Sequence, residues 1–427
     1  MALIWHQTLA MGAQTITSEH VDLGIEPGPD SPASVTERFS LTKGGPSHWL
    51  FALLGGADDY HLAVRSALFA VAVTWLPMFV LSPMFVVSLM RGRPTDPGLT
   101  IPFLRDFAVN VRFLITLPIL LLAEPFIDRK WRLVIGHFLK SKLVTDPDVP
   151  AFEALLARVR RLRDRILPEL LLLFGALSPS LFLSDTEVLM TGLSTWRTTG
   201  AGHSHLTMAG LWFNFVSAPL FRFLLFRWLW RLCLLTLVLW RASRLKLYLV
   251  ATHADLAAGL GFLSFVPRAF SPIVFAGGTV MAAQVANAIA YEGETLSSMK
   301  LPLITYGVFA IILLVVPLTV VTSTLRAVKN KALFAYGALV TIQDQQFDQA
   351  WIRGVHPPGM AILGDAGPSS LIDLGSSFVN IKRMSIVPLD KHALLVLSAA
   401  AAAPMLPLIL WATPAEELLR MVMQMLR

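Results

Sequence analysis

Long runs of apolar residues recur along this chain and alternate with shorter polar or strongly basic connections. An α-helix needs a run of about 20 apolar residues to cross roughly 30 Å of hydrocarbon. Because several runs reach or approach that length, the pattern predicts an all-α, polytopic transmembrane helix bundle of about six or seven spans. The predicted spans lie near residues 66–90, 107–123, 167–183, 206–226, 269–291, 301–325 and 393–412.

The two shortest runs leave the number of spans open. The segments 107–123 and 167–183 are barely long enough to cross the hydrocarbon, and one of them can instead be re-entrant. Prolines lie inside several runs. Membrane helices tolerate them because neighbouring helices satisfy the carbonyl groups that a proline frees.

Basic residues are distributed unevenly among the connections, and this orients the predicted bundle. The connection 128–166 is rich in lysine and arginine, whereas 184–205 carries a single arginine, Arg197. Because lysine-rich and arginine-rich connections stay in the cytoplasm, the pattern predicts a multi-pass protein with a cytoplasmic N-terminus. Three arginines oppose this orientation but are outnumbered: Arg91, Arg93 and Arg105.

The connections on the predicted cytoplasmic side favour amphipathic helices, in segments 128–166, 227–268 and 326–391. Apolar residues between Phe152 and Leu167 share one helical face, and most arginines fall on the other. Such a helix can lie along the anionic inner leaflet or pack against its own bundle.

The first residues of the chain differ from the rest. Residues 1–44 are rich in glycine, proline, serine, threonine and acids and show no sustained periodicity, which predicts a disordered N-terminal tail. The transmembrane helical domain is then expected to occupy residues 45–427.

The composition agrees with a membrane location. Hydrophobic residues make up 55% of the chain and charged residues only 15%, against about 25% charged residues in soluble domains. The net charge of +7 does not indicate nucleic-acid binding, because the basic residues lie between apolar runs. Cys233 is the single cysteine, which excludes an internal disulfide and a cysteine-based metal site. We expect membrane lipids as partners and no cofactor or metal, and we leave homo-oligomers and protein partners open.

Polar side chains inside the predicted spans are candidate functional residues, because burying them in lipid costs several kcal/mol. The candidates are Asp106, Arg112, Glu124, Arg222, Gln284 and Asn287.

Each candidate also has a structural interpretation. Arg112 can pair with Asp106, and Arg222 can belong to an ion pair within the bundle. Gln284 and Asn287 lie beside a face of small residues, so they can join helices instead of lining a water path. Arg227 and Arg231 follow the span and are expected to reach the lipid headgroups.

The densest polar cluster follows the fourth predicted span and contains His253, Asp255, Gly259 and Gly261. Histidine and aspartate two residues apart can bind a metal or pass a proton. Two ligands at this spacing are a weak metal signal, however, and Asp255 can equally cap a helix while the glycines allow close packing.

The cluster lies in the stretch ATHADLAAGLGFL, which resembles a motif of uncharacterised bacterial polytopic inner-membrane proteins, Thr-His-Pro-Asp-x-x-Gly-Gly-Leu-Gly-Phe-Leu. Other segments are also similar to that family: TWLPMFVLS, PFLRDFAVNVRFL, LLLAEP, and DLGSSF with a later VP. The resemblance therefore covers roughly residues 45–427. The chain departs from the motif at Ala254, where the family has proline, and at Ala258, where it has glycine. The resemblance implies a bacterial inner-membrane location and a polytopic architecture. It does not imply any particular reaction.

Three functions are compatible with these patterns. A transporter or channel for a small, anionic solute is favoured by Arg112 and Arg222 within the spans. A membrane scaffold or assembly factor with a cytoplasmic helical platform is the alternative. An enzyme that acts on lipid headgroups through His253 and Asp255 is the third, and it requires both residues to face a cleft.

Overall fold

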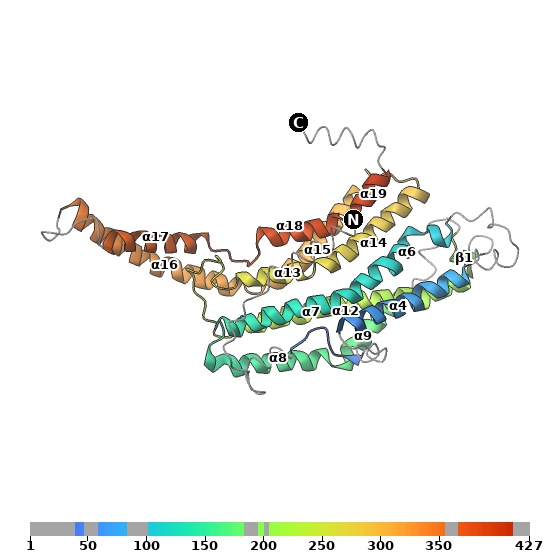
Figure 1. The fold of residues 1–427 in the computed structure, drawn as a ribbon, viewed down its shortest axis with the longest axis horizontal. Coiled ribbons are helices and arrows are strands. Elements are labelled where there is room, and N and C mark those ends of the chain that lie inside the picture. Colours follow the sequence, from blue (N-terminus) through green and yellow to red (C-terminus); the bar gives the residue numbers. More distant parts are fainter. Residues whose placement is uncertain are drawn as a thin grey trace.

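The computed structural model describes residues 39–46, 59–82, 101–182, 195–199, 205–354 and 366–412. Within these ranges the regular secondary structure is helical apart from one small pairing, in which β1 (Thr198–Thr199) lies antiparallel to β2 (His205–Leu206), and loops connect the helices. Figure 1 shows long helices packed side by side along one direction, with a two-helix arm projecting from one end.

Five of the described helices are long and apolar enough to cross a membrane, or six if a pair bent by 44° is counted as one span. This bears out the predicted all-helical fold of an integral membrane protein. The five run from Asp59 to Leu81 (α4), Phe107 to Lys140 (α6, η2, α7), Met208 to Ala242 (α11, η5, α12), Gly261 to Tyr291 (η6, α13, α14) and Lys300 to Thr319 (α15). The fourth of these consists of η6 (Gly261–Ser264), α13 (Phe265–Ala269) and α14 (Ser271–Tyr291).

The bent pair is the predicted last span. It consists of α18 (Lys391–Ala402) and α19 (Met405–Ala412), which meet at Pro404. The break follows from the sequence, because proline lacks the N–H that would continue the helical hydrogen bonds. The predicted span 167–183 corresponds to α9 (Ile166–Phe182), a helix of 17 residues that packs on α12.

Two of the long helices contain one turn of π-helix directly before a proline. The turn η2 (Arg112–Thr116) joins α6 (Phe107–Val111) to α7 (Leu117–Lys140), whose second residue is Pro118. The turn η5 (Phe213–Ser217) likewise joins α11 (Met208–Trp212) to α12 (Ala218–Ala242) before Pro219. A π turn is the accommodation expected next to a residue that cannot donate a backbone hydrogen bond.

The same two helices are much longer than their predicted spans. They contain 34 and 35 residues, which corresponds to about 51 and 52 Å of helix. The apolar core of a bilayer is only about 30 Å thick. The α6–α7 helix continues past Ala123 because the charge of Glu124 is paired inside the protein with arginines of α12.

The predicted amphipathic helix is α8 (Val149–Arg163), and it packs on α12. Phe152, Leu156 and Val159 are at most 1% exposed, so its apolar face is covered by the protein's own helices. Of the two alternatives open from the sequence, the structure shows packing against the bundle.

The arm is formed by α16 (Thr322–Phe347), its terminal π turn η7 (Asp348–Ile352) and α17 (Ala366–Arg383). The two helices pack against each other and project away from the bundle (Figure 1). Outside the arm, the predicted helical segments end early. In the segment 227–268 the helix stops at Ala242, and a loop then runs to Gly261. In the segment 326–391 a second loop follows Arg383.

Residues 39–44, which the sequence places in the tail, pack against the bundle. Phe39 and Leu41 are each 3% exposed and belong to the hydrophobic core. Residues 1–38 lie outside the described residues.

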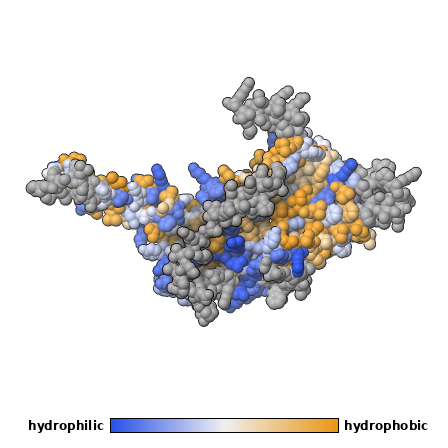
Figure 2. Space-filling model, in the orientation of Figure 1, coloured by the Kyte–Doolittle hydropathy of each residue, from blue (hydrophilic) through white to orange (hydrophobic). Residues whose placement is uncertain are grey.

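The surface of the bundle is divided by polarity. Large apolar side chains are exposed on several helices, including Leu68 on α4, Leu171 on α9 and Leu301 on α15. Figure 2 shows apolar residues gathered over α4, α6 and α14, and hydrophilic residues gathered around α8. An apolar band of this kind is what helices in contact with lipid require. We call the two ends of the bundle the Asp106 end, where α6 begins, and the Gly259 end, where α13 begins.

Candidate functional site

The carboxylate of Asp106 is the centre of a buried polar cluster. Asp106 is the N-cap of α6, and its Oδ1 accepts the backbone N–H of Val109 at 3.1 Å. Arg197 and Trp196 donate to Oδ2 at 3.1 and 3.0 Å, and the amide of Asn287 donates to Oδ1 at 2.9 Å. Burial alone would raise the pKa of Asp106, but Arg197 and these donors outweigh it, so the pKa lies below its ordinary value.

Two sequence-predicted candidates therefore meet in this cluster. Asn287 lies on α14, and its Oδ1 also accepts the backbone N–H of Phe107 at 2.9 Å. Asn287 thus joins α14 to the start of α6, which is the helix-joining alternative. Each of the atoms named here has a partner inside the protein, so the cluster fixes the positions of helices.

The two arginines predicted inside spans lie elsewhere. The guanidinium of Arg112 lies over the ring of Phe221, 5.5 Å from its centroid, and Asp106 forms its ion pair with Arg197 instead. Arg222 donates to the carbonyl of Ala176 and the hydroxyl of Ser180 on α9, at 3.2 and 2.9 Å. Neither arginine lines the cavities described below.

Glu124 is the third charged candidate, and two arginines of α12 hold it. Its Oε1 lies 3.3 Å from Nη1 of Arg227, and its Oε2 lies 3.0 Å from Nη2 of Arg231. Both arginine side chains are almost fully buried, so they point into the bundle and not to headgroups as the sequence suggested. Arg231 also lies over the ring of Trp228.

The small-residue face of α14 has two parts. Gly277 and Gly278 allow close contact, because added Cβ atoms there would meet Tyr306 of α15 and the Ala401–Pro404 bend. Further along, Ala282, Ala283 and Ala286 line an apolar cavity of about 430 Å³ together with α6 and α19. Gln284 is exposed on another side of α14, outside both the cavity and the Asp106 cluster.

The predicted His/Asp/Gly cluster forms a compact loop around one carboxylate. Asp255 accepts backbone N–H groups of Ala257, Gly259 and Gly261 at 2.9, 3.1 and 2.8 Å. His253 Nδ1 lies 2.9 Å from Oδ1 of Asp255. Burial alone would raise the pKa of Asp255, but the three backbone donors and His253 outweigh it and hold the pKa below its ordinary value.

Glycine is needed at two positions of this loop. Gly259 has a φ of +93°, a conformation that other residues rarely adopt. A Cβ at Gly261 would lie 2.9 Å from Oδ2 of Asp255, so only glycine lets the carboxylate come this close. The carboxylate of Asp255 organises the backbone of the loop, and it reaches the N–H of Gly261 where η6 begins. The N-cap of η6 is Leu260, so Asp255 is not the N-cap residue of a helix.

This loop forms one wall of a cleft of about 900 Å³ at the Gly259 end. The other walls come from the end of α7, from α13 and from the connection between α17 and α18. Apolar residues such as Phe262 and Leu389 line the cleft together with polar residues: His137, Ser141, Tyr248, His253, Asp255, Ser264, Arg268, Arg383, Ser385, Asp390 and Lys391.

Positive charge exceeds negative charge in the cleft. Asp255 is occupied by backbone donors, and Asp390 pairs with Arg268 at 3.3 Å and caps α18 by accepting the N–H of Ala393. Arg383 and Lys391 have no carboxylate within ion-pair distance in the described part of the chain. The N-terminus of α18, with its positive dipole end, lies at the same cleft. This arrangement can bind an anion.

The described residues contain no group of three or more histidine, cysteine, aspartate or glutamate side chains placed to hold a metal ion. Several residues of these sites are not among the sequence candidates: Trp196, Arg197, Arg268, Arg383 and Lys391. The only signal for Arg197 is that no other lysine or arginine lies in the connection 184–205. Arg383 and Lys391 are indistinguishable by sequence from other basic residues near spans.

Comparison with known proteins adds no further constraint. No protein-family model, no curated protein and no solved structure matches this chain.

Proposed function

We propose that this protein is a membrane carrier for a small anionic solute and that the cleft at the Gly259 end is its binding site. The observation that carries the proposal is that two cations without carboxylate partners in the described structure, Arg383 and Lys391, line the cleft. The N-terminus of α18, a helix of 12 residues, lies at the same cleft. Cations and helix N-termini are the groups that bind carboxylates and phosphates.

The shape of the cleft supports a small ligand. Its volume of about 900 Å³ lies within the range of roughly 300–1,000 Å³ that is usual for ligand pockets. It combines apolar walls with a few converging polar groups, which is the usual composition of a binding site.

The discontinuous helix α18–α19 supports a carrier over a static binding protein. In secondary transporters the half-helices of broken spans point their N-termini at anionic substrate groups. Here α18 begins at the cleft, at Lys391. The bend between α18 and α19 at Pro404 lies against Gly278 of α14. A movement of α18 would therefore reach both the cleft and the interior of the bundle.

We further propose a bacterial inner-membrane location with the Gly259 end in the cytoplasm. The basic residues of α8 and the arm support this orientation through the positive-inside rule. The test uses Ser141→Cys and Ser297→Cys in a Cys233→Ser background, since both serines are exposed at opposite ends of the bundle. An impermeant maleimide applied to intact cells is expected to label only position 297. Labelling of position 141 alone would reverse the orientation.

The binding proposal is tested with inorganic phosphate, sulfate and citrate as probes on purified protein in detergent. The double variant Arg383→Gln/Lys391→Gln is expected to weaken binding of whichever probe binds the parent by at least about tenfold, because both charged donors are lost. The matched control is Lys331→Gln/Arg353→Gln, which removes two charges from the arm and leaves the cleft intact.

Transport is measured separately. Vesicles containing the parent protein are expected to take up the bound probe, and vesicles with the double variant are expected to lose that uptake. Equal binding by the cleft variant and the arm variant would overturn the site, and binding without uptake would overturn the carrier.

A scaffold function is the second candidate, and the arm favours it. Phe334 is 84% exposed, Ile352 73% and Ile372 68%, although the hydrophilic side of the bundle is nearby. The variant Phe334→Ser/Ile372→Ser would then abolish cross-links to another protein while anion binding is unchanged. The headgroup enzyme is not proposed, because the Asp255 carboxylate is occupied by three backbone donors.

A further inference from the structure

Residues Phe39–Pro46 form a strap that crosses the bundle where α4 begins. Its first residues are anchored in the hydrophobic core by the buried side chains of Phe39 and Leu41. Its later residues, Thr42 and Lys43, are held differently, by hydrogen bonds and charges from three helices, α7, α12 and α4. The strap therefore has an apolar anchor and a second part that is held by polar contacts alone.

One buried carboxylate binds the centre of the strap. Asp128 of α7 is fully buried and accepts the Ser40 hydroxyl at 2.5 Å and the backbone N–H groups of Leu41 and Thr42 at 3.2 and 3.4 Å. Arg132, one turn further along α7, balances its charge at 3.1 Å. These hydrogen bonds hold residues 40–42 of the strap against α7, in addition to the apolar anchor.

Arginines and a lysine hold the strap on its other sides. Arg163 of α8 donates to the carbonyl of Ser40, and Arg231 of α12 donates to the carbonyl of Thr42 at 3.1 Å. Lys43 of the strap pairs with Asp59, the first residue of α4, at 2.5 Å. This last pair is partly exposed, and exposed ion pairs are weak and sensitive to salt.

Two glycines let the strap lie directly against α8 and α9. Gly44 and Gly45 have φ values of +137° and +85°. A Cβ at Gly44 would overlap Asp164 and Arg163, and a Cβ at Gly45 would overlap the carboxylate of Glu169. The seated position of the strap thus requires glycine at both places.

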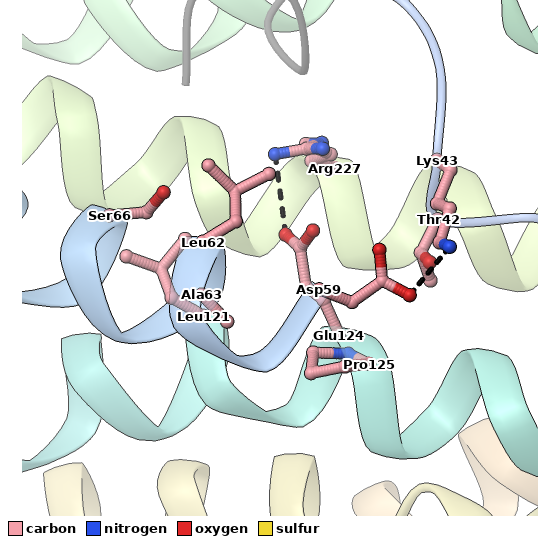
Figure 3. A pocket seen from close by; sticks show the side chains of 10 residues that line it. All are labelled: Thr42, Lys43, Asp59, Leu62, Ala63, Ser66, Leu121, Glu124, Pro125 and Arg227. Atoms are coloured by element: carbon pink, nitrogen blue, oxygen red, sulfur yellow. Dashed lines mark ion pairs between the residues drawn. The ribbon is translucent and has the colours of Figure 1, made fainter. Parts of the chain in front are cut away.

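A small cavity of about 50 Å³ lies beneath the strap (Figure 3). Thr42, Lys43 and Asp59 form its outer side, and Glu124 and Arg227 form its inner side. Nη1 of Arg227 is buried and has no hydrogen-bond partner among the described residues, although Glu124 lies 3.3 Å away. Leu62, Leu121 and Pro125 also line the cavity, so its walls combine apolar and charged groups. The unpaired donor of Arg227 gives a water molecule in the cavity a hydrogen-bond partner.

We propose that the strap is a gate over the charged interior of the bundle. In the seated position, Thr42 and Lys43 cover the outer side of the cavity, and the Glu124–Arg227 pair keeps little contact with solvent, with Glu124 17% exposed. When the polar part lifts about its apolar anchor, water and small ions reach that pair. The purpose of the gate rests on the proposed carrier function, because a carrier must close one entrance to its interior. The position of the strap over the cavity is independent of that function.

The gate is tested by the reactivity of a cysteine placed in the cavity. Ser66 of α4 is 4% exposed and lines the cavity, so Ser66→Cys in a Cys233→Ser background is the reporter. With a charged methanethiosulfonate reagent on the full chain in detergent, it is expected to react far more slowly than the exposed reference Ser297→Cys. Adding Gly44→Ala is expected to raise its rate by about tenfold or more, because the overlap and the strained φ unseat the strap.

The matched control for Gly44→Ala is Gly293→Ala. Gly293 also has a positive φ, of +73°, but an added Cβ there meets nothing within 4 Å. If Gly44→Ala does not fold, Lys43→Gln/Asp59→Asn removes the outer ion pair alone and is expected to raise the same rate by a smaller factor.

Fast labelling of position 66 in the reporter protein with an unaltered strap would overturn the gate. An unchanged labelling rate with both strap variants would also overturn it. Because labelling requires no substrate, failure of the carrier proposal would leave this result unaffected. A gate confirmed by labelling in a protein that transports none of the probes would separate the two inferences.

Discussion

The carboxylate of Glu124 lies 3.0 Å from the guanidinium of Arg231, and this ion pair joins the two longest helices in the interior of the bundle. Arg227 approaches the same carboxylate from one turn away along α12. The pair explains how a glutamate can continue an apolar helix: its charge is neutralised by the neighbouring helix and not by water.

The first prediction concerns Glu124→Ala, which leaves two buried arginines without their carboxylate. Removing one partner of a buried ion pair typically costs about 3–5 kcal/mol. We expect a loss of stability of that order, measured as unfolding in a detergent titration with SDS.

The control for this prediction is Asp348→Ala, which removes an exposed pair with Arg353 on the arm. Exposed pairs contribute about 0–1 kcal/mol. If Glu124→Ala were as mild as Asp348→Ala, the pair would not be needed to hold α7 to α12.

The second prediction concerns pH and the Asp255 loop. The pKa of Asp255 is held below the ordinary value of 3.8, so the carboxylate stabilises the fold above that pH and loses this contribution as the pH falls through the lowered pKa. The parent is expected to be more stable than Asp255→Asn at pH 7. The difference is expected to disappear in strong acid, as measured by thermal unfolding along a pH series.

The same comparison in a His253→Ala background identifies the source of the effect. Three backbone donors contact the carboxylate, so the difference between Asp255 and Asn is expected to persist without the histidine. A difference that vanishes with His253→Ala would mean that the histidine, and not the loop backbone, holds Asp255.

The third prediction concerns the contact between α14 and α15. A Cβ at Gly277 would lie 2.5 Å from the hydroxyl of Tyr306, which donates to the carbonyl of Val274. We expect Gly277→Ala to cost about 1–3 kcal/mol, the usual cost of overpacking. Detergent unfolding measures the effect.

Two further variants test this interpretation. Gly307→Ala is expected to be neutral or slightly stabilising, because nothing lies within 4 Å of its added Cβ. Combining Gly277→Ala with Tyr306→Phe is expected to recover part of the loss, since the overlapping hydroxyl is gone. No recovery would mean that the overlap with Tyr306 is not what makes Gly277→Ala costly.

The helices themselves could be predicted because apolar length is a local property of the sequence. The lengths of α7 and α12 could not, because they depend on pairing across the bundle. For an isolated helix it is correct to end the predicted span at its first charged residue, here Glu124. That inference fails in the folded protein because Arg227 and Arg231 lie opposite Glu124 and neutralise its charge.

The candidate sites show the same division. Asp106 and Asn287 stand out individually as polar residues at spans, but only the fold brings them to 2.9 Å. The motif around Asp255 identifies a loop with an unusual backbone, whereas the cleft beside it depends on Arg383 and Lys391, far away in sequence. The strap looks like a tail, because its anchors are only two apolar residues, Phe39 and Leu41.

The length of the α6–α7 and α11–α12 helices has a mechanical consequence. Each is about 20 Å longer than the hydrocarbon is thick. Because each helix continues through its π turn, a change of its tilt within the bilayer would also displace the end that protrudes from the hydrocarbon. The protruding ends would therefore move farther than the segments that lie inside the hydrocarbon.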